Sequence, residues 1–225
     1  MGGGSVPKRS TVSCLLFLLF SVWLSQAQTG KVETIAGPPE GNVPQAVKDA
    51  LEAKGYRVTL DDGSVACEIW LRRTVPAQTK KDVAGAVYPQ LAESTMLGVI
   101  SFPHDATDYR GQTVKAGIYS LRYELIPNDG NHLGVSPNRD FALLVPLSSD
   151  SDPNATFKFE ELVNLSRKTT GTRHPAPMNL PQPSGAAAGT VAKDDEDHWI
   201  LSAELKLASG ESLPFALVVK GTAPQ

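Results

Sequence analysis

A polar segment at residues 128–140 carries most of the side chains in this sequence that could do chemistry. It lies between two strongly apolar stretches, and loops held by a rigid sheet often carry binding groups. Arg139 could clamp an anion through two parallel hydrogen bonds, or it could hold the loop by pairing with a carboxylate. The same residue types also form turns, so a purely structural role stays open. The candidate ligand-binding residues of this segment are Asp129, Asn131, His132, Arg139 and Asp140.

The histidines are the second set of residues with chemical potential. All four lie at loops or strand edges, at positions 104, 132, 174 and 198. A metal site needs two or three imidazoles that converge, with carboxylates behind them, and here only the fold could bring them together. The candidate metal ligands are His132 and His174, and Asp129 or Asp140 would add a carboxylate. A metal at this place would lower the pKa of a bound water to about 7 and make it a nucleophile for hydrolysis.

Composition and missing motifs exclude several classes of function. The formal charge of −3 gives no electrostatic attraction to nucleic acid or to an anionic membrane. The sequence contains no G-x-S-x-G, H-E-x-x-H, C-x-x-C or glycine-rich phosphate loop. The acidic run at 194–197 lacks the alternating ligands and the central glycine of a calcium loop. We therefore expect no cofactor and no nucleic-acid partner.

The N-terminus has the pattern of a secretory signal peptide. Lys8 and Arg9 precede an apolar run at 11–24, and small residues follow at the −3 and −1 positions of a cleavage site after Ala27. The alternative is an uncleaved anchor, but the run is short for a spanning helix. The pattern predicts that 1–27 is removed and that the protein is secreted or periplasmic, with no transmembrane span in the mature chain.

Two amphipathic segments predict short helices. From 42 to 54 apolar residues recur at helical spacing, with Asn42 as the N-cap and Gly55 as the stop. From 158 to 170 acidic residues precede an apolar stripe and basic residues follow it, as the helix dipole favours. Gly171 then supplies the residue that commonly ends a helix.

Alternating apolar residues predict strands along most of the remaining chain. The clearest lie at 56–60, 65–71, 99–102, 118–126 and 141–145, and a hairpin at 199–207 and 213–219 ends the chain. Cys67 falls on the apolar face of its strand, so we expect a buried thiol. Because no regular β-α-β alternation occurs, we predict a mainly β fold, an antiparallel β-sandwich with two short helices. It should form a single domain over 28–225, with a helix–hairpin element at 42–73.

The segment 110–150 resembles a family of uncharacterised secreted bacterial proteins, the DUF2911-like group. The run AGIYSL at 116–121, followed by PNDG at 127–130, is similar to the AGTYSL…P…DG signature of that family. The longer run DGNHLGVSPNRDF at 129–141 is similar to hypothetical secreted proteins of Acidobacteria and similar bacteria. The resemblance implies export and a β-sandwich, and it brings no catalytic residues.

Two functions follow from these patterns. The favoured one is an exported, non-catalytic β-sandwich that binds a ligand, a glycan or an envelope protein. Its contact surface would combine the 128–140 segment with the Pro-rich stretch at 173–183, where His174 and Met178 lie. The alternative is a metal-assisted hydrolase that uses the loop histidines. A structural role for Arg139, as a staple of its loop, is the third possibility.

Overall fold

A seven-stranded antiparallel sheet forms the centre of the computed structural model, which describes residues 1–4, 30–78, 83–127 and 137–223. The strands lie in the order β1-β2-β3-β4-β7-β8-β9. Every neighbouring pair is antiparallel. Their bounds are β1 Lys31–Ala36, β2 Lys54–Thr59, β3 Val65–Leu71, β4 Met96–Phe102, β7 Gly117–Leu125, β8 Asp140–Pro146 and β9 Pro177–Asn179.

A three-stranded antiparallel sheet packs against one face of the large sheet. It consists of β10 Thr190–Lys193, β11 Trp199–Lys206 and β12 Ser212–Lys220, in that order. Inward residues of β11 and β12 join those of β2, β3, β4, β7 and β8 in one apolar core. In β11 buried and less buried positions alternate, as the sequence pattern of the C-terminal hairpin predicts. A short ribbon of β5 Ala106–Thr107 and β6 Thr113–Val114 completes the strands.

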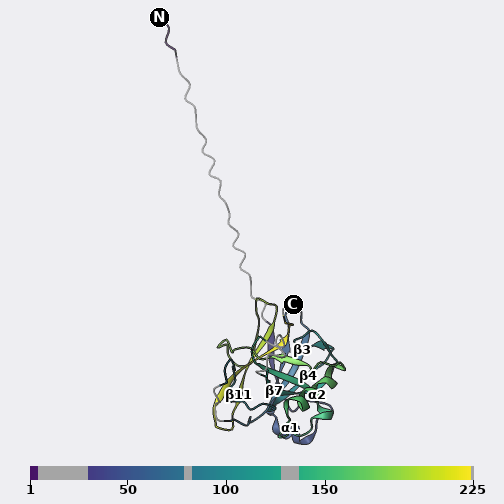
Figure 1. Ribbon diagram of the computed structural model, residues 1–225. Helices are drawn as coiled ribbons and strands as arrows, with labels where there is room; N and C mark the ends of the chain where they lie inside the picture. Colours follow the sequence, from purple (N-terminus) through teal and green to yellow (C-terminus); the bar gives the residue numbers. More distant parts are fainter. Residues whose placement is uncertain (5–29, 79–82, 128–136, 224–225) are drawn as a thin grey trace.

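Two helices cover the other face of the large sheet. The helix α1 (Gln45–Ala50) packs Val47 against Trp70 and Val99. The longer helix α2 (Phe159–Thr170) packs Leu162 and Val163 against β8. A 3-10 turn, η1 (Leu147–Ser149), follows β8. In Figure 1, β11 lies on one side of β7 and the two helices on the other.

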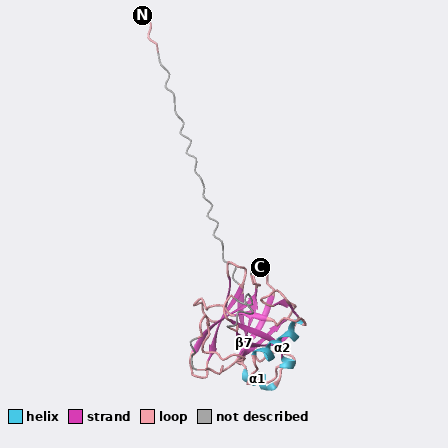
Figure 2. Ribbon diagram, in the orientation of Figure 1, coloured by secondary structure: helices cyan, strands magenta, loops and turns pink. Residues whose placement is uncertain are grey.

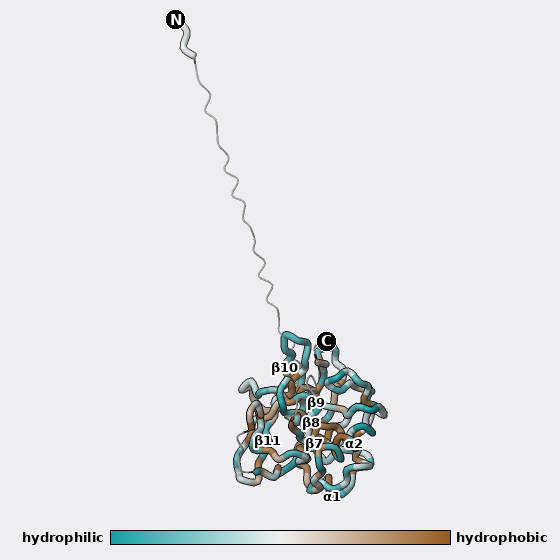
Figure 3. Tube along the Cα trace, viewed as in Figure 1, coloured by the Kyte–Doolittle hydropathy of each residue, from teal (hydrophilic) through white to brown (hydrophobic). Residues whose placement is uncertain are grey.

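The predicted fold class is therefore confirmed. Among the described residues, strands hold 41% and helices 11%, which makes the fold mainly β, with antiparallel sheets and two helices (Figure 2). Apolar residues gather along the strands at the centre of the body, and hydrophilic residues lie toward its outside (Figure 3). Among the described residues, no helix has the length and apolar character needed to cross a membrane.

The predicted helix at 42–54 is too long at both ends. The helix begins at Gln45 with Pro44 as its N-cap residue, and it ends at Ala50. Gly55, expected as the helix stop, lies inside β2 opposite Trp70. A Cβ atom at Gly55 would lie only 2.7 Å from Nε1 of Trp70. The glycine is thus needed for the close approach of an indole, which a local pattern does not reveal.

The second helix agrees closely with the predicted 158–170. Lys158 is its N-cap residue, and the backbone N–H of Lys158 donates to the Glu161 carboxylate at 2.9 Å. Gly171 ends it in the left-handed conformation, at φ 65°. The buried thiol is also confirmed: Cys67 is 0% exposed, and burial raises its pKa to about 12.

Candidate functional site

Arg139 forms hydrogen bonds that hold its own segment in place. Its Nε and Nη2 donate to the carbonyl oxygen of Ile126 at 3.1 and 2.8 Å, and Nη1 donates to the carbonyl oxygen of Ala84 at 3.1 Å. These bonds join the end of β7 to the segment that precedes β4. Three other predicted binding residues, Asp129, Asn131 and His132, lie outside the described residues.

Asp140 is placed in the core rather than at a surface. Its side chain is 0% exposed and accepts hydrogen bonds from Val87 N at 2.7 Å and from Tyr88 N at 3.0 Å. The hydroxyl of Tyr123 also donates to it at 2.7 Å. Asp140 thus fixes the 87–88 segment against β7, and it offers no exposed carboxylate to a ligand.

The two loops expected to form one contact surface touch each other. Nδ2 of Asn138 donates to the carbonyl oxygen of Leu180 at 3.2 Å. Met178, expected as an apolar contact for a ligand, is 2% exposed and belongs to the core between the sheets. His174 is half-buried and lies in a different environment, among arginines.

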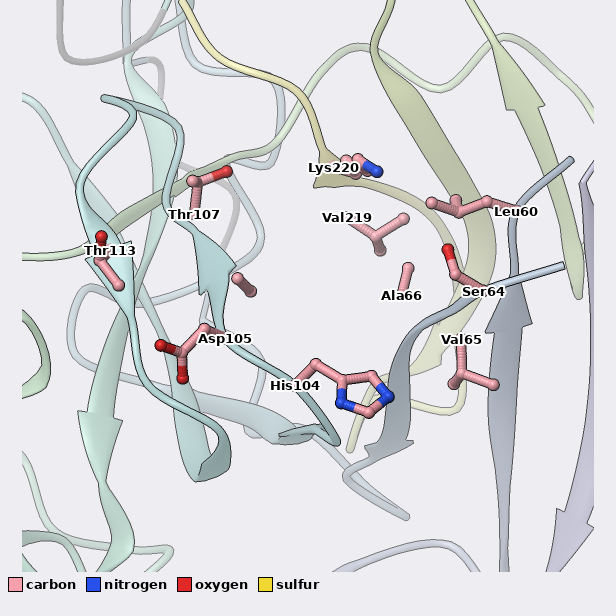
Figure 4. A pocket seen from close by; sticks show the side chains of 11 residues that line it. Leu60, Ser64, Val65, Ala66, His104, Asp105, Thr107, Thr113, Val219 and Lys220 are labelled. Carbon is pink, nitrogen blue, oxygen red and sulfur yellow. The ribbon is translucent and has the colours of Figure 1, made fainter. Parts of the chain in front are cut away.

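The other two histidines do not form a metal centre. His198 is buried, with Nδ1 at 3.1 Å from the Asp194 carboxylate and Nε2 at 2.9 Å from the carbonyl oxygen of Thr222. His104 and Asp105 line a hollow of about 500 Å³ (Figure 4). The carboxylate of Asp105 pairs with Lys115 at 2.7 Å. Across the described part of the chain, no three His, Cys, Asp or Glu side chains gather as metal ligands.

A smaller pocket of about 90 Å³ concentrates positive charge. Its rim and floor are contributed by β8, α2, the turn between β5 and β6, and the segment that follows α2. Four basic and four apolar residues line it: Arg110, Arg167, Arg173 and His174, with Phe141, Phe159, Val163 and Pro175. We call this feature the cationic pocket. None of its described lining residues is acidic.

A tight turn presents Arg110. The carboxylate of Asp108 accepts hydrogen bonds from the backbone N–H of Arg110 at 2.9 Å and of Gln112 at 2.8 Å. Gly111 makes this turn possible, because it adopts a φ of 78° that other residues rarely take. The carboxylate of Asp108 thus binds the backbone of its own turn, and Arg110 is exposed.

Gln112 joins this turn to the segment that follows α2. Its Nε2 donates to the carbonyl oxygen of Pro175 at 2.8 Å and to Asp108 at 2.6 Å. Its Oε1 accepts from the hydroxyl of Thr172 at 2.9 Å. The carbonyl oxygen of His174 in turn accepts from Thr170 at 2.8 Å. These hydrogen bonds hold the β5–β6 turn at a fixed distance from the segment that follows α2, without any ligand.

Arg167 enters the pocket from the last turn of α2. Its Nη1 donates to the side-chain oxygen of Asn164, one turn earlier. Its Nε is buried and has no hydrogen-bond partner among the described residues. A buried N–H without a partner is uncommon and costs stability.

His174 is held as an uncharged acceptor beside Arg173, whose Nε donates to its Nε2 at 3.2 Å. Loss of solvent contact lowers the pKa of His174 below its ordinary value of 6.5, and so do the guanidiniums of Arg110, Arg173 and Arg167. At pH 7 the imidazole is therefore neutral, and the positive charge of the pocket comes from the three arginines.

Arg122 is a buried arginine whose N–H groups all have hydrogen-bond partners. It is 0% exposed and pairs with Asp150 through Nε at 2.7 Å and Nη2 at 2.6 Å. Its remaining N–H groups donate to the carbonyl oxygens of Ser94, Ala155 and Asp152. By contrast, none of the three pocket arginines forms a salt bridge with a described acidic residue.

Sequence reasoning singled out only His174 among the four basic residues of the pocket. Arg110 and Arg167 lie far apart in the sequence, in a turn and in a helix, and each reads alone as an ordinary surface charge. The available clue was the Arg173–His174 pair that closely follows a helix with Arg167 in its last turn.

Comparison of the chain with protein families, with curated proteins and with solved structures finds no match to any of them.

Proposed function

We propose that this protein is an exported, non-catalytic binding module that holds the anionic group of its ligand in the cationic pocket. One observation carries the proposal: Arg110, Arg167 and Arg173 line a single pocket to which no described residue contributes a carboxylate. Three like charges at one place repel one another, so an anion that enters relieves this repulsion. A hydrogen bond between charged partners contributes roughly 1.5–3 kcal/mol, which suffices for selective binding.

Export is the second part of the proposal. It rests on the basic start, the apolar run and the small residues of the 1–27 segment. The resemblance of 110–150 to secreted bacterial proteins points the same way. A glycan or an envelope protein, the partners expected from the sequence, would fit this pocket through an acidic group.

The surroundings of His174 argue against the metal-assisted hydrolase. Three guanidiniums lie around this imidazole, and a divalent cation bound to it would meet their repulsion. Nε2 of His174 also accepts a hydrogen bond from Arg173 and so is not free for a metal. For these reasons the binding module is the function that we propose.

The substitution Arg110→Gln tests the proposal. It removes one exposed guanidinium and keeps a polar side chain on the turn. We expect the affinity for small anions to fall about tenfold or more, since each charge-assisted contact is worth about 1.5–3 kcal/mol. Isothermal titration calorimetry at low ionic strength, with phosphate, sulfate, acetate and short-chain carboxylates, measures this change.

Lys54→Gln is the matched control. It removes the same charge from β2, which β3, β4 and β7 separate from β8 in the large sheet. Its anion affinities should equal those of the wild type. The proposal fails if the wild type binds none of these anions, or if both substitutions weaken binding equally.

A further inference from the structure

We infer that the ligand of the cationic pocket is a small carboxylic acid with a short apolar body, and that this body contacts the pocket floor. The inference rests on the proposed anion site and names the chemical class that it takes. Two features of the pocket carry it: the composition of the floor and its volume.

The floor is apolar and belongs to the packed layer between α2 and β8. Phe141 is 3% exposed and Val163 is 5% exposed, and both belong to the same buried cluster. Phe159 packs against that cluster and also lines the pocket. A free oxyanion would bind at the guanidiniums and leave the accessible part of this floor, to which half-buried Phe159 and Pro175 contribute, in contact with water. A ligand with an apolar end removes that surface from water and binds more tightly.

The volume sets the size of the apolar end. The pocket measures about 90 Å³. An apolar cavity of roughly 150 Å³ accepts benzene, so this one is smaller than an aromatic ring requires. A branched alkyl group fits, whereas a sugar ring or a nucleoside is too large. The ligand, or the part of it that enters, is therefore short.

The arrangement of rim and floor favours a carboxylate over a phosphate. In an aliphatic acid the charged oxygen atoms are two bonds away from the hydrocarbon body, and here the arginines and the apolar floor line the same pocket. A phosphate or sulfate carries polar oxygen atoms on all sides, so some of them would face Phe141 and Val163 without a partner. Burial of unpartnered polar atoms is unfavourable.

The decisive experiment compares isovalerate with acetate, phosphate and sulfate on the wild-type protein by calorimetry. Isovalerate has the branched body, acetate has the charge without it, and the two oxyanions have more charge and no body. We expect isovalerate to bind at least tenfold more tightly than each of the others, with a negative heat-capacity change that reports apolar burial.

A variant that fills the floor adds an independent readout. Val163→Leu places one more methylene group in the pocket and should weaken isovalerate binding at least fivefold while acetate binding stays unchanged. Val43→Leu makes the same change in the cluster under α1 and should alter neither affinity. The melting temperatures of both variants confirm that they fold.

The outcomes separate the two proposals. If phosphate or sulfate binds as tightly as isovalerate, the pocket takes anions but the inferred ligand class is wrong. If Val163→Leu weakens acetate and isovalerate equally, the floor does not contact the ligand and the inference is again overturned. If none of the four anions binds, the proposed function itself fails and the inference falls with it.

Discussion

Glu124, the carboxyl group of β7, is buried and forms no ion pair with a residue that the structure describes. Its side chain is 1% exposed, its Oε2 accepts from the backbone N–H of Leu125 at 3.2 Å, and its Oε1 has no partner among the described residues. Burial is the main reason that the pKa of Glu124 is raised to about 8, and the nearby charge of Glu93 adds to the effect. At pH 7 the folded protein therefore keeps this group protonated.

This raised pKa predicts that the folded state loses stability as the pH rises. Below the ordinary pKa of 4.5 both states bind the proton, and between 4.5 and about 8 only the folded state does. The free energy of unfolding should then fall by up to about 1.4 kcal/mol per pH unit across that window. Glu124→Gln should flatten this dependence and should be the more stable protein at pH 8. Urea unfolding from pH 5 to pH 9 measures it.

Glu160→Gln serves as the control, because this glutamate is exposed in the first turn of α2. It should leave the pH profile unchanged. A wild-type stability that is flat between pH 5 and pH 8 would contradict the assignment of a buried, protonated Glu124.

At the scale of the elements, the short turn between β5 and β6 positions Arg110 at the pocket. Gln112 joins this turn to the carbonyl oxygen of Pro175 at 2.8 Å and to the hydroxyl of Thr172 at 2.9 Å. Gln112→Ala should release Arg110 from its place opposite Arg173 and lower the affinity for anions several-fold. Because Gln112 also donates to the buried carboxylate of Asp108, we expect the free energy of unfolding to fall by about 1–3 kcal/mol. Calorimetry and thermal unfolding together distinguish the two effects.

Gln45→Ala provides the comparison, since that side chain donates to Asp49 at 2.8 Å on α1 and lies outside the pocket. Its anion affinity should match that of the wild type. If Gln112→Ala binds anions as the wild type does, the turn does not position Arg110.

The elements also explain how far the sequence could predict this protein. The helix α2 and the C-terminal hairpin were predictable because their caps, periods and turns lie within one short stretch of chain. The predicted helix at 42–54 was too long because Gly55 is required by its close contact with Trp70 on the neighbouring strand, and not by a helix end. The strand β9 was missed because Pro177 breaks the usual strand pattern, and only its place at the sheet edge permits a proline there. The pocket was missed for a similar reason, since its arginines meet only after β6 and α2 pack together.

At the scale of the whole molecule, one core joins the two sheets, and Cys67 lies within it. Its thiol is 0% exposed and burial raises its pKa to about 12, so it is neither accessible nor ionised in the folded state. In a Cys14→Ser protein, we expect a thiol reagent to label Cys67 only when the sheets separate. The labelling rate should rise with urea in parallel with the unfolded fraction measured by circular dichroism. Labelling that precedes unfolding would indicate that β3 opens locally.

The cationic pocket lies on a chain whose formal charge is −3. At an ionic strength of 0.1 M the influence of an exposed charge extends over about 10 Å, so the pocket acts only on anions that are already close. At low ionic strength the field of the whole molecule reaches further, and this field repels anions rather than guiding them. Long polyanions meet that repulsion along their entire length, whereas a small acid with one charge meets little of it. If the proposed function holds, encounter with an anion is unguided at long range, and retention depends on the contacts inside the pocket.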